Sequence, residues 1–172
     1  KNLMPNTNSS TIKVQKRDGR LEDLDINKIH FVVEEACEGL SGVSSSQIEM
    51  NANIQFYDGM TTKDIQNVLV RSANDLISLE SPNYQYAAAR LLSYDVRKEA
   101  HGQYEYIPLL KLILRNIRSG VYDKGILEKY TKTEIKKFNT WIKRERDLKF
   151  TYAGLRQICD KYLVQDRSSG QI

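Results

Sequence analysis

A short alternating segment that runs directly into a helix-period segment restricts the fold of this chain more than any other feature. Residues 11–16, TIKVQK, alternate apolar and polar side chains, and residues 20–26, RLEDLDI, do so again. Asp18-Gly19 between them is a signal for a two-residue hairpin turn. The segment therefore predicts two antiparallel strands joined by a tight turn and followed at once by a helix.

Four helices are predicted between this hairpin and residue 103. Side chains that cap helix N-termini mark three of the starts. The first helix has Asp25 or Asn27 as its cap. The third has Thr61 with Asp64 three residues on, and the fourth has Ser81 followed by Pro82. The second follows SSSQIEM and stops near Tyr57-Asp58-Gly59, while Gly39 and Gly42 end the first. Apolar residues recur at helical spacing in the first and third helices: Ile29, Val32, Val33, Ala36 and Leu40, then Ile65, Val68, Leu69, Leu76 and Ile77.

Residues 104–172 predict further helices and an incomplete hairpin. The helix faces contain Leu110, Ile113, Leu114 and Ile117, then Ile135, Phe138 and Ile142 after a Thr131/Glu134 capping box, then Leu155, Ile158, Cys159 and Tyr162. The end, KYLVQDRSSGQI, is typical of a strand, a turn and the first residues of a returning strand. Because a cut hairpin leaves backbone groups unpaired, we expect the chain to be a piece of a longer protein.

The predicted fold class is therefore mainly α, with a β-hairpin over a four-helix bundle, followed by further helices and a truncated β-hairpin. We divide the chain into a flexible tail at 1–11, a domain at 12–103 and a helical segment at 104–172.

The charge is distributed unevenly along the chain. Residues 1–103 contain 11 Lys and Arg against 14 Asp and Glu, and residues 104–172 contain 15 against 8. The basic run KKFNTWIKRERDLK at 136–149 is more typical of a solvated helix face than of a binding patch. We therefore expect no binding to nucleic acid, and no apolar run reaches the roughly 18–20 residues that cross a membrane.

The residue types that carry catalysis are sparse and scattered. Cys37 and Cys159 form no Cys-x-x-Cys pair, which favours core positions and a reducing, cytoplasmic setting. His30 and His101 lack the spacing of metal ligands, and no phosphate-binding glycine loop or nucleophile motif is present. We expect no catalytic residue and no metal site in this chain.

Three stretches together carry a family resemblance: VQKRDGRLEDLDINKI, IQFYDGMTTKDIQ and PNYQYAAARLLSYDVRKEAHGQY. They resemble the N-terminal part of the large (alpha) subunit of class I, aerobic ribonucleoside-diphosphate reductase. The match continues through ERDLKFTYAGLRQICDKYLVQD. The first hundred residues are similar to the ATP-cone, a regulatory domain with a β-hairpin lid over four helices. Cys37 and Cys159 match none of the family's catalytic cysteines, so the resemblance implies that the catalytic ten-stranded barrel lies outside this chain.

The resemblance also implies a site for ATP or dATP, with Mg, that regulates ribonucleotide reduction. Lys16 and Arg17 would meet the phosphates, and Thr62 would add a hydroxyl and helix N–H groups. Glu22 and Asp25 would accept from the adenine amino group. The complete set is Lys16, Arg17, Glu22, Asp23, Leu24, Asp25, Ile26, Asn27, Lys28, Thr62, Ile65 and Lys98.

The implied partners are the remainder of the large subunit, the radical-generating small (beta) subunit and further copies of the large subunit. Gln66 and Asp95 stand where well-studied relatives carry histidines near the effector. Asp95 lies one helical turn before Lys98 and can compete with phosphate for it. The resemblance therefore leaves open whether dATP inhibits.

Two other functions compete with this one. A nucleotide-sensing transcription repressor can be built on an ATP-cone, but the zinc-ribbon cysteines of such repressors are missing here. A helical interaction module without a ligand would require the charge-rich hairpin to be incidental. Nucleotide titration separates this last function from the others.

Overall fold

The computed structural model of the chain describes residues 12–164, so the predicted tail lies outside the described residues. The chain forms two compact units, one up to Leu92 and one from Ser93. The division falls inside the long helix α4 (Tyr84–His101). Each unit is described separately below.

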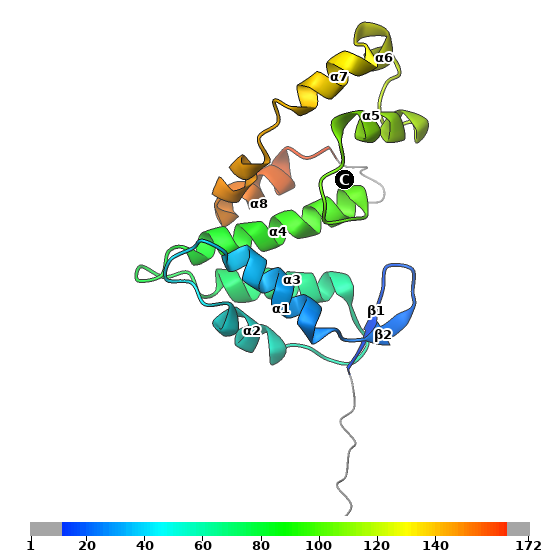
Figure 1. Ribbon diagram of the computed structural model, residues 1–172. Coiled ribbons are helices and arrows are strands. Elements are labelled where there is room, and N and C mark those ends of the chain that lie inside the picture. The colour runs from blue at the N-terminus through cyan, green and yellow to red at the C-terminus, as the bar shows by residue number, and fades with distance from the viewer. Residues whose placement is uncertain (1–11, 165–172) are drawn as a thin grey trace, which may run out of the picture. The chain divides into compact units, whose positions relative to one another are not determined.

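A three-stranded sheet begins the first unit (Figure 1). Strand β1 (Lys13–Gln15) pairs antiparallel with β2 (Leu21–Asp23), as the alternating segments predict. On its other edge β1 pairs in parallel with the two-residue strand β3 (Met60–Thr61). The parallel strand was not predicted, because two residues are too few to show a period. The sheet order is β2-β1-β3.

The hairpin turn differs from the predicted two-residue form. Lys16 N–H donates to the Arg20 carbonyl at 2.8 Å and Gly19 N–H donates to the Lys16 carbonyl at 2.9 Å, so three residues form the loop. Gly19 has φ +85, which favours glycine because it has no Cβ. This is a type I turn followed by a bulge glycine, the usual three-residue solution. Strand β2 is also shorter than RLEDLDI, because Asp25 and Ile26 already belong to the start of the next helix.

Three complete helices follow in the first unit, and Figure 1 shows them together: α1 (Ile26–Cys37), α2 (Ser45–Asn53) and α3 (Thr62–Asn74). Side chains of Asp25, Ser44 and Thr61 cap them by accepting from backbone N–H groups. The core includes Val33, Ile48, Leu69 and Leu91, all exposed by 2% or less. The predicted apolar faces of the first and third helices are therefore confirmed within the helices themselves.

The helix ends differ from the predicted ones in four places. Helix α1 ends before Gly39, which has φ +70, so Leu40 lies beyond it. Helix α2 ends well before Tyr57, and Leu76 and Ile77 follow α3 rather than extend it. Helix α4 begins at Tyr84, after a turn through Pro82 and Asn83, rather than at a Ser81 cap. In each case a local turn lies where the prediction extended the helix. Apolar spacing alone does not show at which residue a helix begins or ends.

The second unit contains the end of α4 and five short helical segments: α5 (Leu109–Arg118), α6 (Gly125–Lys129), α7 (Lys132–Asn139), the 3₁₀ helix η1 (Arg144–Lys149) and α8 (Tyr152–Lys161). The predicted capping box of Thr131 and Glu134 is present at α7. Four side chains on these helices are buried: Ile113, Ile135, Leu155 and Cys159.

Two predictions for the second unit are wrong. Residues 136–149 are not one helix, because α7 ends at Asn139 and η1 begins only at Arg144; Ile142 between them is 51% exposed. The predicted strand at the end of the chain is absent from residues 161–164, where Lys161 ends α8 and a turn follows. The rest of the predicted hairpin lies outside the described residues.

A tyrosine-centred network links separate segments of the second unit. Tyr106 donates through its hydroxyl to Asp147 and accepts from Arg97 at 2.7 Å. The guanidinium carbons of Arg97 and Arg144 each lie 4.5 Å from the centre of the Tyr106 ring. These contacts join α4 to η1 through cation–π and hydrogen-bond interactions.

No helix within residues 12–164 has the length and apolar character that crossing a membrane requires.

Candidate functional site

The three-stranded sheet brings the charged hairpin to the start of α3. In the parallel pairing Gln15 stands opposite Thr61, and Lys16 and Thr62 are the next residues along the two segments. Asp58 accepts from Lys13 N–H at 2.7 Å, and the Lys13 carbonyl accepts from Gly59 N–H at 2.8 Å. The hairpin and the N-terminus of α3 are thus held together by backbone contacts. Sequence reasoning missed this role of Asp58, for which the Asp58-Gly59 turn was the available signal.

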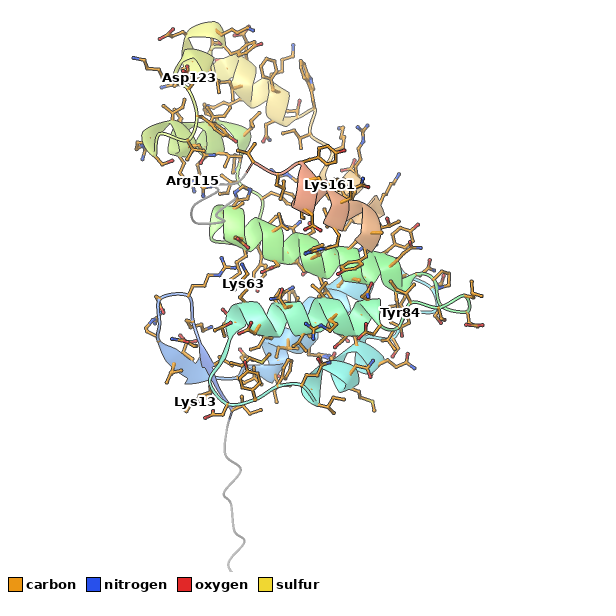
Figure 2. The ribbon with its side chains drawn as sticks, turned by 180° about the vertical axis from the view of Figure 1, so that it is seen from behind. Lys13, Lys63, Tyr84, Arg115, Asp123 and Lys161 are labelled. Atoms are coloured by element: carbon orange, nitrogen blue, oxygen red, sulfur yellow. The ribbon has the colours of Figure 1, made fainter. Side chains whose placement is uncertain are left out.

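The N-terminus of α3 is well ordered by its own side chains. Thr61 accepts from Asp64 N–H at 3.0 Å and donates to the Asp64 carboxylate at 2.6 Å. The next residue, Thr62, is the first of the helix and is half-buried. Figure 2 shows Lys63 at the same end of α3, near the hairpin. A helix start with N–H groups and a lysine favours an anion, although Asp64 offsets part of that charge.

Opposite charges on the hairpin are paired, both across its two sides and along the chain at the turn. Lys16 lies 3.0 Å from Glu22, and Arg20 lies 2.7 Å from Asp18 and 3.7 Å from Glu22. Lys13 pairs with Asp23 in the same way. Hydrogen bonds from the Arg20 backbone and side chain hold the pKa of Asp18 below its ordinary value. Glu22 therefore has two cationic neighbours, and the hairpin from Lys13 to Asp23 carries four cationic and three acidic side chains.

The segment that joins the hairpin to α1 supplies mostly backbone and capping contacts. Leu24 N–H donates to the Ile12 carbonyl at 2.8 Å, which extends the hairpin by one pair. Asp25 caps α1 by accepting from Lys28 N–H at 3.0 Å. Ile26 is 61% exposed, and Asn27 beside it is exposed as well. One carboxylate oxygen of Asp25 is thus engaged in the fold rather than free for a ligand.

Ile65 and Lys98, two further residues of the predicted site, have contacts of other kinds. Ile65 is 7% exposed and belongs to the core face of α3. Lys98 lies near the end of α4, in the second unit, where its amine donates to the Tyr104 hydroxyl at 3.2 Å and lies 4.6 Å from the centre of that ring. The residues that the structure brings together are therefore those of the hairpin, the start of α1 and the start of α3. The role of Lys98 stays a prediction.

Gln66 and Asp95, the departures from well-studied relatives, are both 8% exposed. Gln66 donates from its side-chain amide to the Leu91 carbonyl at 2.8 Å, so it links α3 to α4 within the first unit. This bond accounts for a buried amide at this position, because a buried polar group needs a partner.

The cysteines do not have the properties of nucleophiles. Burial raises the pKa of the half-buried Cys37 to about 11 and also raises the pKa of Cys159. Both are therefore neutral thiols near pH 7, and the thiolate is the reactive form. Across residues 12–164, no three His, Cys, Asp or Glu side chains gather in a way that suits a metal ion.

The sequence matches the ATP cone domain family over residues 12–99, and the chain belongs to this family. It is also similar, over nearly all of its length, to the N-terminal region of alpha subunits of ribonucleoside-diphosphate reductase. Identity is 44% over 164 residues with subunit alpha of reductase 1 from Escherichia coli strain K12, covering 95% of this chain and 22% of that protein. It is 42% with the subunit from Haemophilus influenzae over 164 residues, covering 95% and 22%. It is 42% with the subunit from Enterobacteria phage T4 over 163 residues, covering 94% and 21%. The chain thus spans about a fifth of the length of these relatives.

Proposed function

We propose that this chain senses adenine nucleotides for a ribonucleotide reductase, as the regulatory part of its large subunit. ATP or dATP, with Mg, binds the hairpin and the start of α3, and this binding regulates the reduction of ribonucleoside diphosphates to deoxyribonucleotides for DNA synthesis. The remainder of the large subunit, the small subunit and further large subunits are the partners in that enzyme. Membership of the ATP cone family and the likeness to reductase alpha subunits support the proposal.

The observation that carries the proposal is the parallel pairing of β1 with β3. This pairing ends with Gln15 opposite Thr61, so Lys16 and Arg17 follow one strand and Thr62, with the first N–H groups of α3, follows the other. A triphosphate bears about four negative charges, and charge-assisted hydrogen bonds are the strong contacts for such a ligand. Side chains from two places in the sequence thus converge on one anion.

The ion pairs of the hairpin explain how a phosphate can be accepted without leaving a carboxylate unpaired. Lys16 contacts Glu22 at 3.0 Å, but Glu22 also lies 3.7 Å from Arg20. When Lys16 turns to a phosphate, Glu22 keeps Arg20 as its cationic neighbour. Glu22 is then positioned to accept from the adenine amino group, and the exposed Ile26 offers apolar surface to the base.

Calorimetric titration of the chain with ATP and dATP tests the proposal. Lys16→Gln removes one charge-assisted contact, worth on the order of 1.5–3 kcal/mol, and should weaken binding roughly ten- to a hundredfold. Lys13→Gln is the matched control, because Lys13 lies on the same strand and also pairs with a carboxylate, but is not assigned to the ligand. Equal weakening by both variants would indicate a general charge effect, and no heat with either nucleotide would favour the ligand-free interaction module.

A further inference from the structure

A cavity of about 600 Å³ opens within the second unit. Its lining comes from the segment before α5, from α5 itself and from α7. The apolar wall consists of Ile107, Leu110 and Leu114, and the basic side chains at the cavity are Lys111, Arg115, Arg118 and Lys136. None of the residues that line it is acidic or aromatic. We call this cavity the basic groove.

The spacing on α5 produces two parallel rows. Leu110 and Leu114 are four residues apart and lie one above the other on the helix. Lys111, Arg115 and Arg118 follow at intervals of four and three residues and form the adjacent row. Seven residues of helix rise about 10 Å, so the cations at the ends of the row stand roughly that far apart along the axis. An apolar row beside a cationic row therefore faces the groove.

One of these cations is already used by the fold. Arg115, marked in Figure 2, donates to the carbonyls of Ala100 at 3.1 Å and His101 at 3.2 Å, which lie at the end of α4. Lys111, Arg118 and Lys136 are different, because none of them has a side-chain hydrogen bond or ion pair to another residue within 12–164. The groove thus carries three positive charges that the described part of the chain does not balance.

The combination of both rows selects the kind of ligand. A small anion would use the cations but not the leucine wall. A single-stranded nucleic acid binds best where aromatic side chains stack on its bases, and the lining has none. A helical peptide can present carboxylates at i, i+4 and i+7 in a row beside a row of apolar side chains.

We propose that the basic groove binds an acidic, amphipathic peptide segment of a partner protein. The apolar side chains of the segment cover Leu110 and Leu114, and its carboxylates meet Lys111, Arg118 and Lys136. The groove belongs to the second unit alone, and the proposal does not depend on the nucleotide function.

Fluorescence anisotropy with the full chain tests this. The probe is a labelled synthetic peptide with Glu at i, i+4 and i+7 and Leu on the adjacent face, and its partner probe carries Gln in place of every Glu. The Gln probe should bind at least about tenfold more weakly than the Glu probe. Added salt should weaken the binding of the Glu probe. The Lys111→Glu, Arg118→Glu double variant should lose at least about tenfold in affinity. Leu114→Gln should weaken both probes, because it removes part of the apolar wall.

The double variant Lys132→Glu, Lys137→Glu is the matched control, because it reverses two charges on α7 outside the lining. It should bind the Glu probe as the wild type does, and far-ultraviolet circular dichroism should show all variants folded. Unchanged affinity in the double variant overturns the proposal. If equal concentrations of inorganic phosphate or ATP displace the peptide, the groove is a small-anion site and the proposal is overturned. If the groove prefers a single-stranded oligonucleotide to the peptide, it is a nucleic-acid site and the proposal is overturned as well.

Discussion

The two units are stabilised in different ways. Of the 24 buried apolar side chains within residues 12–164, 19 belong to the first unit and only 5 to the second. The first unit therefore rests on a packed core, and the acidic side chains of its hairpin are paired with cations. The second unit relies more on Tyr106, Arg97 and Arg115 for links between segments, and it leaves cations at the basic groove unbalanced. The paired charges of the first unit suit a small anionic ligand, which can take the place of a carboxylate beside a lysine. Unbalanced charges beside apolar rows suit a larger partner.

The largest expected effect tests the difference in packing. Leu69→Ala in the first unit should reduce the free energy of unfolding by about 2–5 kcal/mol, because Leu69 is 2% exposed and its loss leaves a cavity. Leu114→Ala in the second unit should cost less than half of that, because Leu114 is only half-buried. Urea unfolding followed by circular dichroism measures both. Equal costs would mean that the two units do not differ in packing as described.

The second prediction concerns Lys98, which the family resemblance assigns to the phosphates. Lys98→Ala should weaken ATP and dATP binding by roughly ten- to a hundredfold, about 1.5–3 kcal/mol, and leave helical content unchanged because alanine is a good helix former. Lys111→Ala should not change nucleotide affinity. Calorimetry measures all three proteins. Wild-type affinity in folded Lys98→Ala, together with weak binding in Lys16→Gln, would confine the site to the first unit.

A pair of equivalent cap substitutions gives a smaller effect in both units. Thr61→Ala and Thr131→Ala each remove a side-chain cap from a helix that an acidic residue also supports, and each should cost about 1 kcal/mol of stability. Only Thr61→Ala should also weaken nucleotide binding, because α3 begins beside the hairpin. Thermal unfolding with and without ATP measures both effects. A loss of nucleotide affinity in Thr131→Ala would argue against a nucleotide site built on the hairpin and α3.

The smallest effect is a pH dependence of opposite sign in the two units. A hydrogen bond to Glu49 at 2.8 Å, followed by the charges of Glu49 and Glu34, raises the pKa of His30 above its ordinary value of 6.5. Its contribution to stability is present below pH 6.5 and is lost as the pH rises through the folded-state pKa. Burial lowers the pKa of His101, so its contribution is present above pH 6.5 and is lost on acidification through the folded-state pKa.

Proton NMR titration of the two imidazoles measures these pKa values directly. His30→Gln should remove the loss of stability above pH 6.5, and His101→Gln the loss on acidification. A His30 pKa at or below that of His101 would contradict the assignment of Glu49 as its partner.

Much of the first unit follows from local sequence chemistry. The cap at Thr61 and the apolar faces of α1 and α3 were predicted, and Asp25 was one of two residues predicted to cap α1. An N-cap and a helical period depend on residues within two turns of each other. The charge-rich hairpin was also recognised, although its three-residue turn was not. Among the candidate site residues, the hairpin and Thr62 could be named from the sequence only through a family resemblance.

The neighbours of those residues depend on contacts between distant segments. Strand β3 has two residues and no period, and only its pairing with β1 brings Gln15, the residue before Lys16, opposite Thr61, the residue before α3. The basic run at 136–149 looks like one helix from its spacing, but the chain leaves the helix at Asn139, whose side chain accepts from Leu109 N–H at 2.9 Å. The basic groove likewise joins α5 to Lys136 and Asn139 of α7, which no local pattern connects to it. Periodicity reports which side of an element faces apolar surroundings, whereas long-range hydrogen bonds and packing settle what lies opposite, and that information is spread over the whole chain.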